Sequence, residues 1–208
     1  MNNGKICIKI LCEGLEEYKY IKKLISFPGI FSSVYYFDEP INCKGINKIF
    51  PRYQDLFTKN LFEVILIFCD ADNNSDDFGL LCSKINNCMF GGADVSNSIV
   101  MFVNPVTLQI VLSHLADVKI ISSSKANNEG LIFQLTGITD YRAHEKQIDE
   151  MMKFVKFSNY KDMRKRVDSL SQNISEVPSS NFGVFLSNFE KSDTQWVDDI
   201  IKKTTNVE

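Results

Sequence analysis

A short, continuous hydrophobic run that ends on two aspartates constrains the fold of this chain more than any other feature. Residues 64–69 are Val-Ile-Leu-Ile-Phe-Cys, rich in β-branched side chains and too few for a typical helix. Such a run is typical of a strand buried on both faces, as in a parallel sheet covered by helices. Asp70 and Asp72 follow directly. In an open α/β sheet, ligands bind outside the carboxyl ends of the strands, so this pair is predicted to face a crevice.

Strand and helix patterns alternate along the first part of the chain. Strands are predicted over residues 5–12, 34–37, 62–69 and 98–103, and helices over residues 15–26, from Pro51, after Ser75 and from Pro105. Ser75 is the expected cap of its helix, since a serine hydroxyl accepts hydrogen bonds from the first free backbone N–H groups. The alternation predicts right-handed crossovers and a mainly parallel sheet. We therefore expect an α/β, Rossmann-like fold in which helices flank a mainly parallel sheet.

The second part of the chain carries a weaker pattern. Residues 118–122 are expected as a fifth, edge strand, and residues 122–140 as a polar loop near the active face or at a subdomain junction. From about His144 the apolar spacing becomes helical, and a last helix is expected over about residues 194–203, with Asp193 as its cap. The predicted organisation is an α/β domain over residues 1–122, followed by a loop and helical C-terminal region over residues 123–208 that packs on it.

Composition limits where the chain works and what it binds. The chain has 208 residues and a net charge of −3, so it has no global positive field that attracts nucleic acid or membrane. Nucleic-acid contact would need a local basic patch or metal ions. No stretch has the length of a membrane span and no signal peptide is evident, so a cytoplasmic location is expected. The six cysteines form no Cys-x-x-Cys pair; they are expected to be reduced core residues, with a structural zinc site as the alternative.

Acidic residues follow two strands of the predicted sheet. Glu13 comes after the first strand, and Asp70 and Asp72 come after the third. Carboxylates that converge in a crevice repel one another unless a cation lies between them, and Mg²⁺ prefers such oxygens. Asp70 and Asp72 are the predicted principal ligands. Glu13 is a further ligand or the general base, and Glu17, four residues beyond it, would hold a second ion or a metal-bound water. The alternative is that these are solvated loop residues and that residues 72–76 are only a turn before a helix cap.

Together these motifs resemble a known family. Glu13-Gly14 after one strand and Asp70-x-Asp72 after another look like the TOPRIM domain of topoisomerases, primases and OLD-type nucleases, over roughly residues 5–115. Residues 13–17, EGLEE, are similar to the EGxTE form of small TOPRIM proteins such as the RloB-like group. In this alignment Glu16 takes the threonine position and Glu17 the second acid.

The resemblance implies a TOPRIM fold and a Mg²⁺- or Mn²⁺-dependent nuclease that cleaves DNA or RNA. The implied catalytic residues are Glu13, Asp70 and Asp72. It also implies an anti-phage defence role beside a partner ABC-type ATPase, because this chain has no phosphate-binding loop of its own. One departure is Gln109, where the family has an acid. This departure favours the competing hypothesis, a non-catalytic TOPRIM-fold module that binds nucleic acid or a protein partner.

A basic run in the C-terminal region is the candidate nucleic-acid surface. Its cations, which surround a single Asp162, are Lys153, Lys156, Lys161, Arg164, Lys165 and Arg166. A basic helical face with Phe157 and Tyr160 nearby is predicted to hold a phosphate backbone, although such a run is also compatible with a solvated helix face. His144 is an acid–base candidate, and the alternative is that it is an incidental loop residue.

Overall fold

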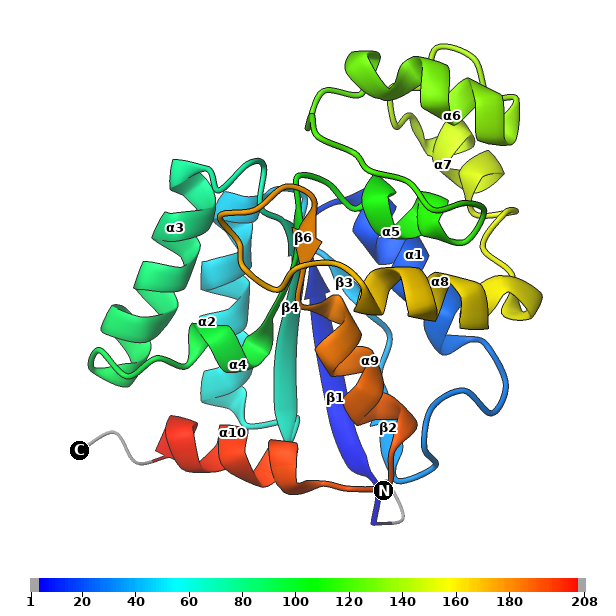
Figure 1. Cartoon of the computed structure of the whole chain (residues 1–208). Coiled ribbons are helices and arrows are strands. Elements are labelled where there is room, and N and C mark those ends of the chain that lie inside the picture. Colours follow the sequence, from blue (N-terminus) through cyan, green and yellow to red (C-terminus); the bar gives the residue numbers. More distant parts are fainter. Residues whose placement is uncertain (1–3, 206–208) are drawn as a thin grey trace.

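Strands from both ends of the chain form one sheet in the computed structural model, which describes residues 4–205 (Figure 1). The strand order is β2 (Tyr35–Phe37), β1 (Ile6–Cys12), β4 (Val64–Asp70), β5 (Val100–Asn104) and β6 (Ser179–Ser180), and β3 (Ile41–Asn42) also pairs with β1. All strand pairs are parallel except the pair of β5 and β6. The predicted α/β class and mainly parallel sheet are therefore confirmed.

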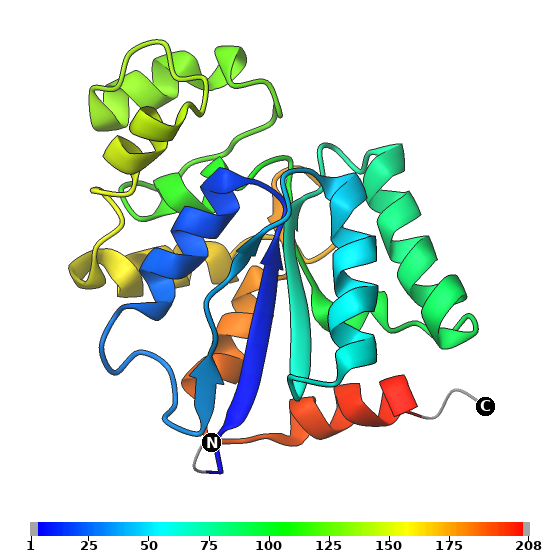
Figure 2. The same ribbon diagram turned by 180° about the vertical axis from the view of Figure 1, so that it is seen from behind.

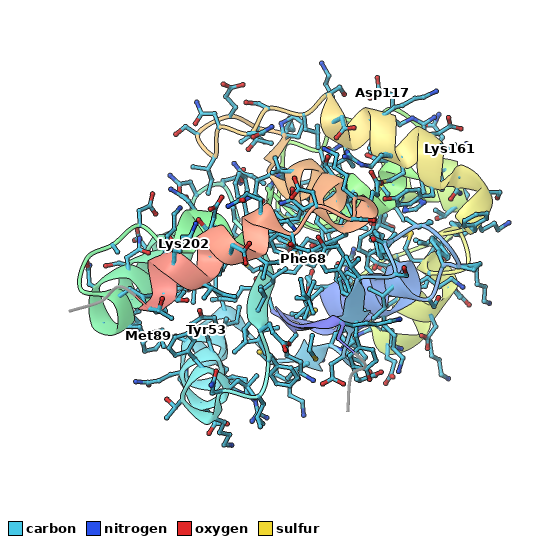
Figure 3. All side chains as sticks on the ribbon, turned by 90° about the horizontal axis from the view of Figure 1, so that it is seen from below. Tyr53, Phe68, Met89, Asp117, Lys161 and Lys202 are labelled. Carbon is cyan, nitrogen blue, oxygen red and sulfur yellow. The ribbon has the colours of Figure 1, made fainter. Side chains whose placement is uncertain are left out.

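The hydrophobic run of β4 lies at the centre of the sheet. Its residues 64–69 are all buried, as expected for a strand with a neighbour on each side and a helical layer on each face. Phe68 packs against Tyr20 and Phe182, with ring centroids 6.3 and 5.0 Å away. Figure 3, which labels Phe68, shows it in the interior of the molecule. Cys7, Cys12, Cys43 and Cys69 are buried, as predicted for core cysteines, whereas Cys82 is only partly buried and Cys88 is exposed, which corrects the prediction for these two.

Helices cover both faces of the sheet (Figures 1 and 2). One face carries α1 (Leu15–Ile25), α5 (Leu108–Ser113), α8 (Tyr160–Asp168) and α9 (Phe182–Glu190), and the other carries α2 (Ile49–Lys59), α3 (Asp76–Ser83) and α4 (Ser96–Ile99). The last helix, α10 (Gln195–Thr205), lies near the amino-terminal ends of the central strands. Single turns lie at Ile46–Lys48, Ala126–Asn128 and Phe157–Asn159, and α3 continues into a π-helix at Lys84–Met89. No helix within residues 4–205 is long and apolar enough to span a membrane.

Several helix boundaries differ from the sequence prediction. The second helix begins at Ile49, before Pro51; proline is tolerated there because the N–H groups of the first turn have no partner within the helix. The helix expected from Pro105 begins at Leu108. Ser75 caps α3 as predicted, with its hydroxyl oxygen 3.3 Å from the Phe78 amide.

The expected edge strand over residues 118–122 is absent, which corrects the prediction. The side chain of Gln109 takes the hydrogen bonds that a neighbouring strand would need. Its amide nitrogen donates to the Val118 carbonyl, and its amide oxygen accepts from the Ile120 amide, both at 2.8 Å. The edge position beside β5 is filled instead by β6, a pair of serines with no hydrophobic alternation that could have predicted a strand.

Residues 116–156, which we call the α6–α7 segment, leave the sheet and return. The region 122–140 was expected as a loop, but it contains α6 (Glu129–Thr136), which ends at Gly137 in a left-handed conformation with φ of 74°. After α6 the chain forms α7 (Glu145–Met151). Figure 1 shows both helices beyond the carboxyl-terminal edge of the sheet, near α5 and the start of α1.

The C-terminal region is part of the core. Besides contributing β6, it places the side chain of Asn181 against the backbone of β5, accepting from the Phe102 amide and donating to the Val100 carbonyl, both at 2.8 Å. Asp193 accepts from the Gln195 amide at 3.0 Å, next to the start of α10. The outer ends of the two predicted regions, residues 1–3 and 206–208, lie outside the described residues.

Candidate acidic active site

Strand pairing brings the first two acidic positions together. Cys12 of β1 lies opposite Phe68 of β4, so the two strands end at the same edge of the sheet. The Glu13 amide donates to the Phe68 carbonyl at 3.0 Å, and the Glu13 carboxylate accepts from the Asp70 amide at 3.1 Å. The sequence prediction that acids from the two strand ends lie side by side therefore agrees with the geometry of Glu13 and Asp70.

Asp70 is held by a residue that the sequence did not suggest. One oxygen of its carboxylate, Oδ1, accepts from both the backbone amide and the hydroxyl of Thr107, each at 2.6 Å. Thr107 immediately precedes α5. Burial raises the pKa of Asp70 well above its ordinary value, and the charge of Glu17 raises it further, whereas Lys125 and the Thr107 bond act in the opposite direction.

Gly14, the glycine of the Glu-Gly motif, is in close contact with Glu17 at the start of α1. The buried Glu17 carboxylate accepts from the Gly14 amide at 2.9 Å. A Cβ atom on residue 14 would lie 2.8 Å from Oε2 of Glu17, so a larger residue there would displace this carboxylate from its present position. Burial raises the pKa of Glu17, and the neighbouring charge of Glu16 adds to the shift.

Asp72 begins an unusual turn. Asp72, Asn73 and Asn74 all have left-handed backbones, with φ of 46°, 61° and 60°, a conformation that aspartate and asparagine tolerate better than most residues. Asn104 fixes this turn because its side chain accepts from the Asn73 amide at 2.9 Å and donates to the carbonyls of Ile174 and Glu176. The expected turn and helix cap are thus both present, and Asp72 is the first residue of the turn.

The four acids, Glu13, Glu17, Asp70 and Asp72, which we call the acidic site, influence one another's ionisation. Burial raises the pKa of Glu13 to about 7, the charges of Glu17 and Asp72 contribute to the increase, and the hydrogen bond from Asp70 reduces it. Desolvation also raises the pKa of Asp72, although much of this residue remains accessible to solvent. Mutual repulsion and partial desolvation are therefore both present at this edge of the sheet.

Lys125 supplies positive charge to the acidic site. Its amine lies 2.8 Å from Oε2 of the buried Glu16, whose other oxygen accepts from the Tyr141 hydroxyl at 2.5 Å. The charges of Glu16, Asp70 and Glu17 raise the pKa of Lys125 despite its burial. Lys125 and Tyr141 lie on either side of α6, so Glu16 attaches the α6–α7 segment to α1 at two points.

Sequence reasoning missed these partners. Glu16 was visible within the EGLEE motif but had no assigned role. Lys125 and Tyr141 belong to a polar region without a pattern, and Thr107 precedes a helix as many threonines do. Their roles depend on contacts between residues far apart in sequence: 109 positions separate Lys125 from Glu16.

The acidic site has the right chemistry for a hard divalent cation, because carboxylate oxygens are the ligands that Mg²⁺ prefers. Its side chains are not yet arranged as a ligand set. Within residues 4–205, no group of three or more His, Cys, Asp or Glu is placed to hold a metal ion. One oxygen each of Glu13, Asp70 and Glu17 is engaged by a backbone amide. Metal binding would therefore require rotation of the carboxylate side chains.

The other predicted site residues lie away from these hydrogen bonds. Lys153, Lys156, Lys161 and Lys165 are exposed. Arg164 forms ion pairs with Asp168 and Glu190, and Arg166 donates to the Ser113 carbonyl at 2.6 Å, so both arginines also have structural contacts. His144 is exposed and immediately precedes α7.

Comparison with known proteins identified no relative: no family model matches the chain, and searches of curated proteins and of solved structures gave no match. The resemblance to TOPRIM proteins therefore stays a prediction, and the residues and their geometry support the function proposed below.

Proposed function

We propose that this chain is a metal-dependent nuclease of TOPRIM type that hydrolyses phosphodiester bonds in DNA or RNA with Mg²⁺ or Mn²⁺. The observation that carries the proposal is the crowding of Glu13, Glu17 and Asp70 at the carboxyl edge of a parallel sheet. Burial and mutual repulsion raise the pKa of each. Groups with strongly perturbed pKa values in a crevice are typical of functional sites. Repulsion between buried carboxylates lowers the stability of the fold, and a bound cation would relieve that repulsion.

Each acidic residue has a role that follows from its contacts. Asp70 and Asp72 offer carboxylate oxygens from the end of β4, and the two Thr107 bonds fix the orientation of Asp70. Glu13, with a pKa of about 7, can accept a proton from an attacking water near neutral pH. Glu17 adds negative charge beside it. A bound divalent ion would activate the water and stabilise charge on the phosphate.

A non-catalytic module that binds nucleic acid or a protein partner is the second candidate. Lys125 favours it, because this amine already supplies positive charge to the acidic site. In that case the Lys125–Glu16 pair would be a permanent part of the fold, and the carboxylates would bind no ion. The defence role and the partner ABC-type ATPase belong to the first proposal and rest on the resemblance to TOPRIM proteins.

Cleavage of labelled DNA and RNA separates the two candidates. Purified protein is incubated with single- and double-stranded substrates in Mg²⁺, Mn²⁺ or EDTA, and Glu13→Gln serves as the control for a contaminating nuclease. The nuclease proposal predicts metal-dependent cleavage that EDTA and Glu13→Gln both abolish. Absence of cleavage of every substrate, alone and with the partner ATPase, would support the binding module.

A further inference from the structure

A groove on the outer surface of α8 is separate from the acidic site. It has a volume of about 660 Å³ and lies between α8 and the loop at Gly29 and Ile30. Phe157 at its border is 54% exposed. The ring of Phe157 packs in a T-shaped arrangement on the buried ring of Phe27, with centroids 6.1 Å apart. A large aromatic side chain is thus fixed in place while much of its surface remains open to solvent.

The charge of the groove is positive. Lys161 and Lys165 line it one helical turn apart, and within residues 4–205 neither forms an ion pair. Its acidic residue, Glu190, is engaged by Arg164 at 3.2 Å and by the Tyr160 hydroxyl. Figure 3 shows Lys161 at the outer edge of α8, away from the core. The groove therefore combines an open aromatic ring with two lysines that form no ion pair in the described part of the chain.

We propose that this groove binds single-stranded nucleic acid, with a base stacked on Phe157 and phosphates paired with Lys161 and Lys165. Every nucleotide carries one flat ring and one anion, and proteins that bind single strands combine aromatic platforms with basic grooves. A duplex keeps its bases stacked inside and cannot offer them to Phe157. An acidic peptide would satisfy the lysines and leave the exposed ring without a matching group, so the observations favour the nucleic acid.

The groove lies near the opposite end of α1 from the acidic site. Gly14 immediately precedes α1, and Phe27, the partner of Phe157, follows its end. A helix of 11 residues is about 16 Å long, so the groove is a binding site distinct from the catalytic carboxylates. The claim that this groove holds the substrate of the nuclease rests on the proposed function. Binding itself requires neither metal nor cleavage and can be tested without them.

Fluorescence anisotropy in EDTA tests the inference with the full-length protein. The probes are a labelled single-stranded oligonucleotide, its duplex, and an acidic peptide of similar charge. The oligonucleotide has about 12 nucleotides, a length within the range of site sizes known for single strands. The expected result is tighter binding of the single strand than of either competitor. Equal or tighter binding of the duplex, or binding of the peptide alone, would overturn the proposal.

Matched variants locate the binding site. Phe157→Ala should weaken single-strand binding about tenfold, as expected for loss of one stacked base, whereas Phe157→Trp should retain it. The double variant Lys161→Ala with Lys165→Ala should weaken binding. The slope of log affinity against log salt concentration should also become shallower by about 1.4.

Two control variants lie elsewhere on the surface. Phe133→Ala removes a phenylalanine of α6 that is also 54% exposed, and Lys202→Ala with Lys203→Ala removes a lysine pair of α10. Both should bind like the parent protein. If the groove variants retain full affinity, or if the controls lose as much, the groove is not the binding site. Unchanged circular dichroism in the groove variants would show that a loss of binding is not a loss of fold.

Discussion

The carboxylate of Glu13 accepts a hydrogen bond from the backbone amide of Asp70 across 57 positions of sequence, at 3.1 Å. This bond joins the ends of β1 and β4, and it places one acidic side chain directly beside the backbone of another. The pairing of the two strands does not depend on this side-chain bond, because the Glu13 amide separately donates to the Phe68 carbonyl. The Glu13 side chain thus turns toward β4, where its carboxylate lies among other carboxylates and its pKa rises to about 7.

The first prediction concerns the close approach of Glu17 to residue 14. Gly14→Ala would place a methyl group 2.8 Å from the Glu17 carboxylate, which would have to move and lose its bond to the residue 14 amide. We expect a loss of about 1–3 kcal/mol in the free energy of unfolding, measured with urea. The control is Gly130→Ala in α6, where an added Cβ meets no atom within 4 Å and should be neutral or stabilising. Equal stability of the two variants would show that the Glu17 contact is dispensable.

Gln109 provides a second prediction. Gln109→Met keeps the approximate shape of the side chain but leaves the buried Val118 carbonyl and Ile120 amide without their partner. A buried group left unsatisfied costs about 1–3 kcal/mol, so the free energy of unfolding of the variant should fall by at least about 1 kcal/mol. Amide hydrogen exchange at Ile120 should become faster. Exchange at the parent rate would mean that other groups protect this segment.

His114 should make stability depend on pH. It is buried, with Nδ1 2.8 Å from Oδ1 of Asn159 and Nε2 3.3 Å from the Tyr20 hydroxyl, and burial lowers its pKa from 6.5 to about 4. His114 is therefore protonated below about pH 6.5 in the unfolded chain, but only below about pH 4 in the folded chain. As pH falls through this window, His114 should lower the free energy of unfolding by about 1.4 kcal/mol per pH unit.

The acidic site titrates with the opposite sign. Its raised pKa values mean that the folded state gains protons, and stability, as pH falls. Comparison of parent and His114→Gln removes this shared contribution. The difference in unfolding free energy should change between pH 6.5 and 4, while the exposed His144→Gln control should follow the parent. A difference that is constant over this range would show that the folded protein protonates His114 normally.

Lys125 gives a prediction about metal and stability together. Lys125→Met removes the amine that faces Glu16, Asp70 and Glu17, so repulsion within the acidic site would be uncompensated. We expect a lower melting temperature than the parent at pH 8 without metal, and a larger increase on addition of Mg²⁺. Lys119→Met, an exposed lysine of the same segment, is the control and should resemble the parent. A smaller Mg²⁺ effect in Lys125→Met would show that Lys125 supports metal binding instead of substituting for it.

The sequence predicted the part of the site that depends on strands. The strands β1 and β4 are hydrophobic runs that lie side by side in parallel, so the acids that follow them were expected at one edge of the sheet, and Glu13 and Asp70 lie there. A local pattern also predicted the Ser75 cap of α3. These features depend on neighbours in sequence or on simple periodicity.

The rest depends on single long-range contacts that have no periodicity. Strand β6 is only Ser179–Ser180, and Gln109 prevents residues 118–120 from pairing as a strand through two side-chain bonds. Tyr141 reaches Glu16 across 125 positions of sequence. One polar residue in a loop has many potential partners, and only the folded chain shows which one it contacts.

Titration of Mg²⁺ into the parent protein and Asp70→Asn tests the central claim, that the acidic site binds a catalytic divalent ion. Asparagine keeps an oxygen that can accept both Thr107 bonds, so the variant should fold. We predict saturable binding and a higher melting temperature for the parent, and neither for Asp70→Asn, which should also fail to cleave nucleic acid. If the parent binds no Mg²⁺, or if Asp70→Asn binds it as tightly as the parent, the acidic site is not a metal centre.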